Sequence, residues 1–317
     1  MVWYLSEKLL GLVVTVLVAA LLIFIVLDLL PGDPARFILG LNATPETLAA
    51  LQQQYGLDQS PFQRFFSWLG NMLKGDFGIS TTAGQPVAGM VGAALGVTLP
   101  LSLLAIIFAL GIGVPLGIAA ARREGTLLDR ALMGLARIGI ALPAFWLGML
   151  LVQIFAVALH WLPPGGFVSW SVNPLTAFAS LLLPALALAL PVAALLARNV
   201  RVALVAATGA DYIRTAQAGG LTQREAVWRH GLRNALLASL GTAGLYLAYL
   251  VAGTVIVESV FYLPGLGRLI LDAIAGRDLL LLRSTLLILV LCMLGTTFLA
   301  NLVPIWTDPR LRQGSLE

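Results

Sequence analysis

Residues able to drive energy-consuming chemistry are scarce in this chain. It holds two lysines, Lys8 and Lys74, and neither ends a Gly-x-x-x-x-Gly-Lys-Ser/Thr loop, which would cradle the phosphates of a nucleotide. The two histidines, His160 and His230, stand beside no nucleophile in a recognised motif. Together with one cysteine, Cys292, they are too few for a Cys/His metal cluster. The sequence therefore predicts no ATPase, no other enzyme activity and no metal site in this polypeptide.

Ionisable side chains are also rare where a proton-coupled carrier needs them. Such a carrier requires groups that change charge at bilayer depth. Asp28, Glu258 and Arg283 lie near the ends of apolar runs, and His160 follows the end of another. We interpret these residues as interfacial or inter-helix pairing residues, with a transport role as the alternative. The energy source is therefore expected in another chain.

The composition indicates a membrane protein. Of the 317 residues, 59% are apolar and 11% are charged, whereas a soluble domain carries about 25% charged residues. Runs long enough to cross a bilayer, about 20 residues each, lie at 9–30, 97–121, 138–159, 176–197, 235–257 and 281–303. The first run is too long for a signal peptide and has no small-residue cleavage site after it. We therefore expect an all-α membrane protein with six transmembrane helices, the first of them retained.

Arginine and lysine are distributed unevenly between the predicted loops. The loops 122–137 and 198–234 are short and basic, while the loop 160–175 is uncharged. An even number of spans places both termini on one side, and the positive-inside rule makes that side the cytoplasm. The net charge of +4 follows from this topology. It does not indicate a nucleic-acid surface, because the arginines flank spans and form no continuous stripe.

The first extracytoplasmic loop, 31–96, is expected to be helical. Thr44 and Pro45 are typical of a helix start, and Gly56 is a plausible stop. From Pro61 onward, apolar residues recur at helical spacing on one side of a second, amphipathic helix. They are Phe62, Phe65, Phe66, Leu69, Met72 and Leu73. This helix either lies on the outer membrane surface or is a docking platform for an external partner, and both interpretations stay open here.

Glycine and proline are frequent inside the apolar runs. Examples are Gly113, Pro115 and Gly117 in the second run, Pro143 in the third and Pro184 in the fourth. Small residues let helices pack closely, and prolines permit kinks. The pattern suits both a static bundle, which is the simpler interpretation, and a pathway that opens and closes.

The richest local pattern lies in the basic loop 198–234. A helical stretch from Asp211 is interrupted at Gly219-Gly220, and Thr222 with Glu225 three residues later predicts a capping box for a second helix. Spans tether this hairpin at both ends, which leaves no free recognition helix and argues against DNA binding. A short helix presented to a groove of a cytoplasmic protein fits the pattern better.

A series of short motifs runs in order along nearly the whole chain. They are Leu30-Pro31-Gly32-Asp33-Pro34-Ala35, Tyr55-Gly56-Leu57-Asp58, Gly75-Asp76-Phe77-Gly78, Arg214-Thr215-Ala216, Gly220-Leu221, Arg233-Asn234-Ala235, Pro264-Gly265-Leu266-Gly267-Arg268, Arg277-Asp278 and Asp308-Pro309-Arg310. In this order and spacing they resemble ABC-type importer permeases of the dipeptide, oligopeptide and nickel branch, in the B-type or first-permease form. The loop 198–234 then resembles their EAA loop.

The loop departs from the family pattern at three places. Arg214 stands where the broad family has a glutamate, Gly219 stands where this branch usually has a lysine, and the proline that often follows the Asn-Ala pair is replaced around Ala238. We therefore expect coupling to depend more on shape and backbone contacts than on charge.

The resemblance implies a type I importer fold in the bacterial inner membrane and a division of labour between chains. This chain and a C-type permease would form the pathway, two cytoplasmic ATPases would bind ATP and Mg²⁺, and an extracytoplasmic solute-binding protein would deliver the solute. This chain itself would bind no cofactor and no nucleic acid. Its parts would be 1–30 with the first span, the extracytoplasmic scoop 31–96, a five-helix core 97–307 that includes the coupling loop 198–234, and a cytoplasmic tail 308–317.

The resemblance also implies two sets of contact residues. Contacts to the ATPases are expected at Asp211, Arg214, Thr215, Ala216, Gly219, Gly220, Leu221 and Arg224. Contacts to the binding protein or the outer gate are expected at Asp33, Phe65, Phe66, Trp68, Asp76 and Glu258. Peptides are the favoured solute. The alternatives are nickel or another small solute in the same importer type, a stand-alone secondary carrier, and a structural scaffold.

Overall fold

The computed structural model describes residues 2–29, 44–54 and 58–307, and within them the chain is helical with no strand. The predicted contact residue Asp33 and the predicted helix stop Gly56 lie outside the described residues. Two compact units are distinguished. Of the described residues, the first unit comprises 2–6, Leu99–Leu263 and 293–307, and the second comprises those between Glu7 and Thr98 together with Pro264–Cys292.

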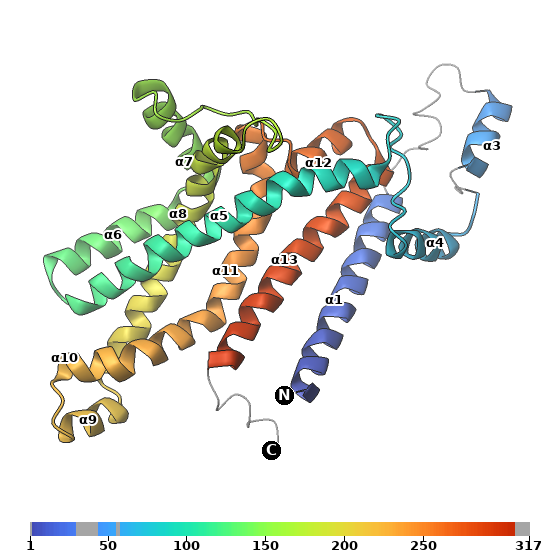
Figure 1. The fold of residues 1–317 in the computed structure, drawn as a ribbon. Helices are drawn as coiled ribbons and strands as arrows, with labels where there is room; N and C mark the ends of the chain where they lie inside the picture. The colour runs from blue at the N-terminus through green and yellow to red at the C-terminus, as the bar shows by residue number, and fades with distance from the viewer. Residues whose placement is uncertain (1, 30–43, 55–57, 308–317) are drawn as a thin grey trace. The chain divides into compact units, whose positions relative to one another are not determined.

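Figure 1 shows the order of the helices along the chain. They are α1 (Val2–Asp28), α3 (Pro45–Gln54), α4 (Pro61–Leu73), α5 (Val87–Arg122), α6 (Leu127–Ala141), α7 (Ala144–Leu151), the π-helix η2 (Val152–Ala158), α8 (Pro174–Thr208), α9 (Asp211–Ala218), α10 (Gln223–Ala226), the π-helix η3 (Val227–Gly231), α11 (Leu232–Val260), α12 (Leu266–Ala275) and α13 (Leu279–Thr307).

Five of the described helices are long and apolar enough to cross a membrane, and a bent helix pair could supply a sixth span. The five are α1, α5, α8, α11 and α13, which cover the first, second, fourth, fifth and sixth predicted runs. Several extend beyond those runs. Helix α5, for example, begins at Val87, ten residues before the predicted start.

The structure differs from the prediction between residues 122 and 159. The segment 138–159 is not one continuous helix, and the connection 122–137 is largely helical. Most of that loop is α6, whose first turn is capped by the Thr126 side chain accepting from the N–H of Asp129. Helix α6 ends at Leu142, which is extended (ψ 129°) because Pro143 follows it and disfavours the helical conformation in the residue before. The chain bends by 106° between α6 and the following α7–η2 segment. A hydropathy window averages over such a bend and does not detect it.

Helix α8 is the most enclosed helix of the first unit. It starts at Asn173, whose side chain caps the N–H groups of Leu175 and Thr176. It packs against α6, α7 and α11. Most of its apolar residues are buried, on nearly all sides of the helix.

Two glycines of α5 let its backbone approach α8 closely. A Cβ atom on Gly113 would lie 2.6 Å from the carbonyl oxygen of Ala193, and one on Gly117 would lie 2.6 Å from that of Ala197. Real Cβ atoms do not come this close to a carbonyl oxygen. The spacing of four residues therefore forms a small-residue contact of the kind that membrane helices use to pack backbone against backbone.

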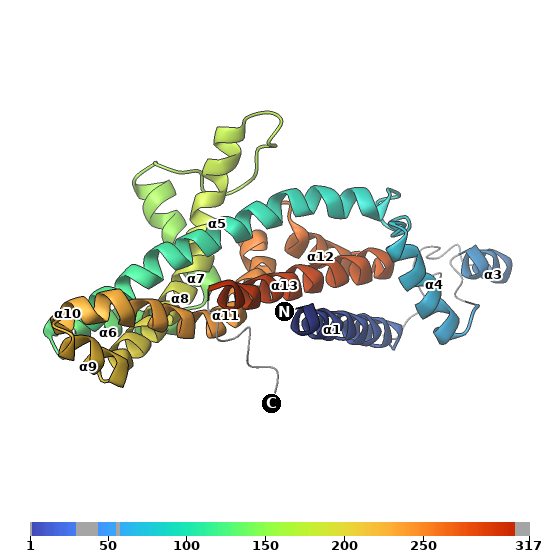
Figure 2. The same cartoon turned by 60° about the horizontal axis from the view of Figure 1, so that its bottom comes forward.

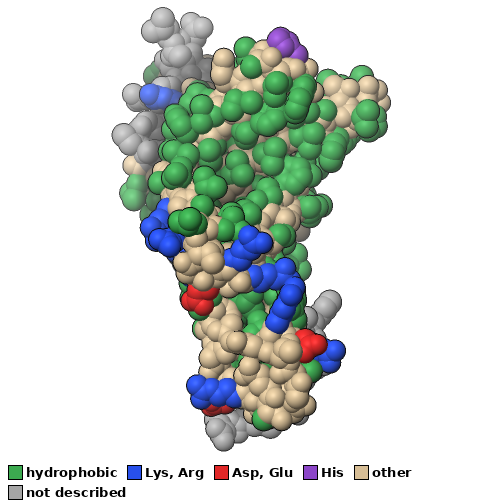
Figure 3. Space-filling view, turned by 90° about the vertical axis from the view of Figure 1, so that its left-hand side faces the viewer, with side chains coloured by type: hydrophobic (Ala, Val, Ile, Leu, Met, Phe, Trp, Pro, Cys, Tyr) green, Lys and Arg blue, Asp and Glu red, His purple; other side chains and the backbone are tan. Residues whose placement is uncertain are grey.

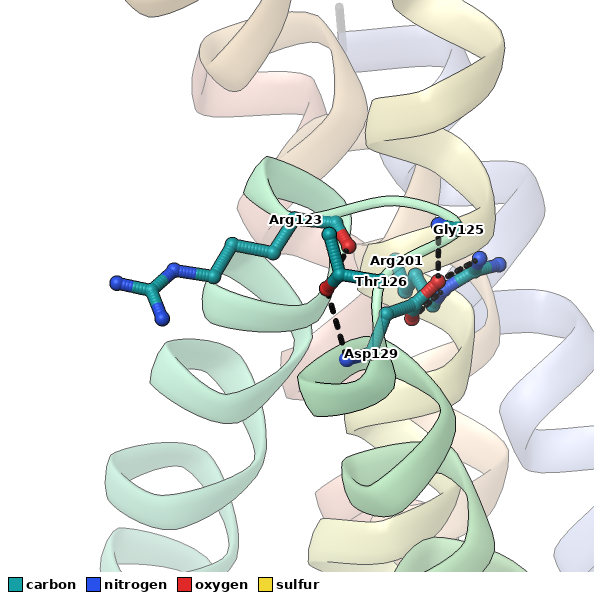
Figure 4. A network of polar contacts seen from close by, with 5 residues as sticks. All are labelled: Arg123, Gly125, Thr126, Asp129 and Arg201. Carbon is teal, nitrogen blue, oxygen red and sulfur yellow. Dashed lines mark hydrogen bonds and ion pairs between the residues drawn. The ribbon is translucent and has the colours of Figure 1, made fainter.

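A buried ion pair joins α6 to α8 in the first unit (Figure 4). The guanidinium of Arg201 donates twice to the carboxylate of Asp129, at 2.6 Å to each oxygen, and the backbone N–H of Gly125 donates to the same carboxylate at 2.9 Å. The Asp129 side chain is only 4% exposed. The side chain of the neighbouring Arg123 points away from the pair (Figure 4), and Arg201 is the arginine that contacts the Asp129 carboxylate directly.

An aromatic cluster packs α4 against α1 in the second unit. The Phe24 ring lies 5.4 Å from that of Phe65 and 6.2 Å from that of Trp68, measured between centroids. Figure 2 shows α4 lying across the end of α1. Beyond the cluster, Arg64 of α4 forms an ion pair with Asp28 of α1 at 2.8 Å. The pairing interpretation of Asp28 is confirmed by this contact.

The predicted starts of α3 and α4 are confirmed. The N–H of Thr47 donates to the Thr44 hydroxyl at 3.3 Å before α3. Before α4, Ser60 forms a capping box with Gln63. The start of α3 was predicted from its cap and proline, whereas that of α4 was predicted from Pro61 and the apolar spacing after it, and the Ser60 box was not anticipated.

A second polar anchor lies at the start of α13. The carboxylate of Asp278 accepts hydrogen bonds from the N–H of Leu281 (3.0 Å), the Ser80 hydroxyl (2.7 Å) and the N–H of Thr82 (3.2 Å). Burial raises the pKa of Asp278, but these hydrogen bonds outweigh it and the pKa lies below its usual value. Asp278 therefore caps α13 as a carboxylate and ties the turn at 80–82 to it.

Placing a large side chain at Gly117 tests the close contact between α5 and α8. We expect Gly117→Leu to lower the free energy of unfolding by about 3 kcal/mol, because the side chain would overlap backbone that cannot move away cheaply. Gly111→Leu in the same helix is the matched control, since no atom lies within 4 Å of a Cβ at that position. Unfolding in mild detergent measures the difference. Equal stability of the two variants would refute the glycine contact.

Removing one charge from the buried ion pair tests its contribution to stability. Asp129→Asn should cost about 3 kcal/mol of unfolding free energy, because it leaves Arg201 without its counter-charge. The control is Asp211→Asn, which breaks an exposed pair with Arg214 (3.5 Å, side chains 96% and 74% exposed) and should cost less than about 0.5 kcal/mol. Thermal unfolding of both variants in one detergent gives the comparison.

Candidate coupling site

The predicted hairpin in the loop 198–234 is present in the structure. Helices α9 and α10 lie side by side, following α8 and preceding η3 and α11 (Figures 1 and 2). Helix α9 ends at Gly219, and Gly220 adopts φ +96°, a left-handed conformation that glycine reaches without steric cost. The N–H of Leu221 then donates back to the carbonyl of Ala216 at 3.3 Å. The predicted glycine break is confirmed, and its cause is the backbone conformation of Gly220.

The second helix of the hairpin begins with the predicted capping box. The Glu225 carboxylate accepts from the N–H of Thr222 at 3.0 Å and from its hydroxyl at 2.8 Å, while the N–H of Glu225 donates to the Thr222 hydroxyl at 3.3 Å. The hydrogen bonds from Thr222 hold the pKa of Glu225 below its usual value. The turn between the helices is therefore fixed at both ends, by Gly220 and by this box.

Apolar contacts attach the hairpin to the first unit. Ile213 in α9 and Ala226 in α10 are both fully buried (0% exposed). The Cδ1 atom of Ile213 would lie 3.6 Å from a Cβ on Gly231, the last residue of η3. Since η3 continues directly into α11, displacement of the hairpin must also act on α11.

The expected ATPase-contact residues all lie on this hairpin. Exposed positions are Asp211, Arg214, Thr215, Gly219, Gly220 and Arg224, and half-buried positions are Ala216 and Leu221. Within the described parts of the chain, no three His, Cys, Asp or Glu side chains are grouped so that they could hold a metal ion.

One contact of the hairpin region was missed by the sequence analysis. The guanidinium of Arg122, at the end of α5, lies 3.8 Å from the centre of the Trp228 ring in η3. A cation at this distance over an indole ring is attracted by its negative face. The only sequence signal was a tryptophan in an otherwise polar loop, because the two residues are far apart in the chain.

The surface near the hairpin changes from hydrophobic to basic. In Figure 3, hydrophobic side chains cover a broad zone, and Lys and Arg side chains form a band next to it on the side of the hairpin. Exposed arginines of this region include Arg123, Arg130, Arg137 and Arg229. The sequence predicted such a change, since apolar spans alternate with basic loops.

The expected binding-protein and outer-gate residues are placed in different environments. Phe65 and Trp68 are buried in the aromatic cluster, whereas Phe66 is 53% exposed. Asp76 is exposed and accepts a hydrogen bond from the N–H of Gly78 at 2.9 Å. Glu258 is fully buried in α11. Among the members of this set that the structure describes, Phe66 and Asp76 have exposed side chains.

Comparison with known proteins gives consistent results along the chain. Residues 113–313 match the family described as binding-protein-dependent transport system inner membrane component, and residues 1–102 match the N-terminal part of such membrane components. A peptide transport system permease protein of Brucella abortus is 38% identical over 296 residues, 93% of this chain and 94% of that protein. The glutathione transport system permease protein GsiC of Escherichia coli is 39% identical over 285 residues, 90% of each chain.

Solved structures show the same fold at lower sequence identity. A chain of the MetNI methionine ABC transporter matches with a TM-score of 0.57 and 19% identity, covering 69% of this chain and 97% of that one. A second crystal form of MetNI gives a TM-score of 0.56. With helices that can span a membrane, this fold and a family match over most of its length, the chain belongs to the inner membrane components of binding-protein-dependent transport systems, and it is a permease subunit of an ABC importer.

Proposed function

We propose that this permease imports peptides or short peptide derivatives and receives the ATP-driven stroke through the hairpin 211–226. The relatives named above as peptide and glutathione permeases support this solute class, since glutathione is itself a tripeptide. Nickel or another small solute carried by the same importer type is the second candidate. A carrier that works alone is less well supported, because few ionisable groups lie within the spans.

The coupling role is supported by a hairpin whose outer surface is exposed while its inner side is packed against the first unit. Its outer surface, with Arg214 and Gly220, is accessible, while Ile213 is completely buried. Helix α8 enters the hairpin and α11 leaves it through η3. A cytoplasmic ATPase that pushes on α9 would therefore move two spans together, which is the rigid-body coupling that switching between inward and outward openings requires.

The proposed assembly contains this chain, a C-type permease, two ATPases and an extracytoplasmic solute-binding protein. ATP and Mg²⁺ would be bound by the ATPases, because the two lysines of this chain lie in no phosphate-binding loop. This chain would catalyse no reaction. It would contribute half of the pathway, and its largely apolar spans suit a pathway whose selectivity is set mostly by the binding protein.

Both termini are proposed to lie in the cytoplasm. The supporting features are the basic segments at 122–137 and 198–234 and the band of Lys and Arg beside the hairpin in Figure 3. The scoop 31–96 would then face outward. Phe66 and Asp76 would meet the binding protein, Phe65 and Trp68 would hold α4 in place, and Glu258 would act at the outer gate. Asp33, which the structure does not describe, is also proposed for the outward contact.

Purification with the products of neighbouring genes tests the assignment. We expect the chain to co-purify with a second permease and two ATPase copies, and ATP hydrolysis to rise when peptide-loaded binding protein is added. Competition between a dipeptide and Ni²⁺ for uptake into proteoliposomes separates the two solute classes. Solute movement by this chain alone without nucleotide would overturn the proposal.

Substitution of Gly220 tests the coupling role. Gly220→Ala should reduce ATP-driven uptake several-fold, because a φ of +96° is strained for any residue with a Cβ. The matched control is Gly209→Ala at the other end of α9, where φ is −88° and the nearest atom to a Cβ is 3.9 Å away. Uptake and ATPase activity are measured together. Normal uptake by Gly220→Ala would count against the hairpin as the coupling element.

Substituting Phe65 and Phe66 one at a time distinguishes a role of α4 in binding-protein docking from a role in folding. Phe66→Ala should lower binding-protein-dependent uptake while leaving basal ATP hydrolysis and thermal stability near wild type, since Phe66 is 53% exposed. Phe65→Ala should lower the free energy of unfolding by about 3 kcal/mol, because it leaves a cavity beside Phe24. Wild-type uptake by Phe66→Ala would leave α4 with a structural role only.

A further inference from the structure

A group of unsatisfied hydrogen-bond donors lies near the end of α1 in the second unit. The Nε atoms of Arg64 and Arg283 and the indole Nε1 of Trp68 are buried and donate to no residue that the structure describes. The hydroxyl of Ser284, next to Arg283 in α13, is also buried and has no hydrogen-bond partner among the described residues. We call Arg64, Trp68 and Arg283 the donor cluster. Buried donors are nearly always hydrogen-bonded in folded proteins, so this group requires an explanation.

The donor cluster also carries an excess positive charge. Both Nη atoms of Arg64 are used by Asp28, at 2.8 and 3.1 Å. Arg283 donates no side-chain hydrogen bond and forms no ion pair with any residue that the structure describes. Its guanidinium lies over the Trp68 ring, 5.4 Å from the ring centre, in a cation–π contact that supplies no counter-charge, and it is within electrostatic reach of Arg64. Among the residues that the structure describes here, two arginines therefore share the single carboxylate of Asp28.

The carboxylate of Asp278 does not act as the counter-charge of Arg283. Asp278 attracts Arg283 at longer range. Its oxygens accept hydrogen bonds from Ser80, Thr82 and the N–H of Leu281, and it forms no ion pair with Arg283. A partly buried guanidinium with neither hydrogen bonds nor an ion pair is costly, and an anion from outside the chain would remove the cost.

The surface next to the donor cluster is apolar. Over the last two turns of α1 before Asp28, Leu22 and Val26 are 56% and 59% exposed, and Leu21 and Ile25 are 43% and 42% exposed. Asp28 ends a helix that is long and apolar enough to cross the membrane, so the cluster lies at the depth of the lipid headgroups. Cationic donors at that depth beside exposed aliphatic side chains are complementary to a molecule with an anionic head and apolar chains.

We propose that the donor cluster binds the phosphate of an anionic phospholipid, with Arg283 as its main ligand and the acyl chains lying along α1. The phosphate oxygens would accept from the guanidinium of Arg283, and small rearrangements would bring the indole N–H and the Nε of Arg64 into the same site. The neighbouring apolar surface favours a lipid over inorganic phosphate, which gains nothing from aliphatic side chains. This site is independent of the proposed solute and of the coupling hairpin.

Lipid retention by the whole importer tests the site. The complex, purified with its partner chains, is placed in nanodiscs of phosphatidylglycerol and phosphatidylcholine, extracted into mild detergent, and analysed for bound lipid by native mass spectrometry. Wild type should retain phosphatidylglycerol, and Arg283→Gln should retain it about tenfold less, the effect of losing a charged hydrogen bond. Lys74→Gln, which removes an exposed charge from the C-cap of α4, should retain it as wild type does.

A gentler variant keeps the test decisive if Arg283→Gln fails to assemble. Trp68→Phe retains the aromatic packing and removes only the indole N–H, and it should lower retention about threefold to tenfold. Unchanged retention in both variants, or in Trp68→Phe alone if the other does not assemble, would overturn the proposal. So would equal thermal stabilisation of the delipidated complex by inorganic phosphate and by phosphatidylglycerol, which indicates a site for any anion. Loss of binding-protein docking in Arg283→Gln with lipid retention intact would assign the cluster to a protein partner instead.

Discussion

The backbone of α5 approaches α8 so closely at Gly113 and Gly117 that no side chain fits between them, and the arrangement of the first unit depends on this contact. Without water inside a bilayer, helices gain little from burying apolar surface against one another, so close van der Waals packing is the main source of specificity. Helix α8 supplies that packing toward α6, α7 and α11 as well. The ion pair between Asp129 and Arg201 adds a directional contact to a largely apolar interface.

The hairpin 211–226 is held firmly against the helices of the first unit. Helices α9 and α10 are exposed, yet Ile213 is buried and the turn is fixed by Gly220 and the Thr222–Glu225 box. A hairpin held in this way could transmit a displacement to α8 and α11, as the proposed coupling role requires, whereas a loose loop could not. The contact between Arg122 and Trp228 connects the end of α5 to the same region. In the proposed mechanism, this hairpin would act as a rigid lever for the ATPases.

The second unit is organised differently, around polar anchors at helix ends. Asp278 gathers the turn at 80–82 and the start of α13, and Arg64 joins α4 to the end of α1. Near the ion pair of Arg64 with Asp28, Arg283 has no counter-charge within the described chain. A membrane protein can leave such a group for its surroundings to satisfy, because lipid headgroups supply phosphates at that depth. The two ends of the unit therefore differ. The hydrogen bonds of Asp278 are made within the chain, whereas Arg283 beside the Arg64–Asp28 pair is free to bind the proposed lipid phosphate.

The sequence by itself determined most of the helices, the caps at Thr44 and Thr222, the break at Gly220 and the family. These features depend on apolar runs or on residues a few positions apart, which a linear reading can detect. Tertiary structure decided the rest. The bend after Leu142, the pairing of Asp129 with Arg201 across 72 residues and the burial of Phe65 but not Phe66 depend on which helix faces which. That choice is made by packing between distant segments, and no local pattern encodes it.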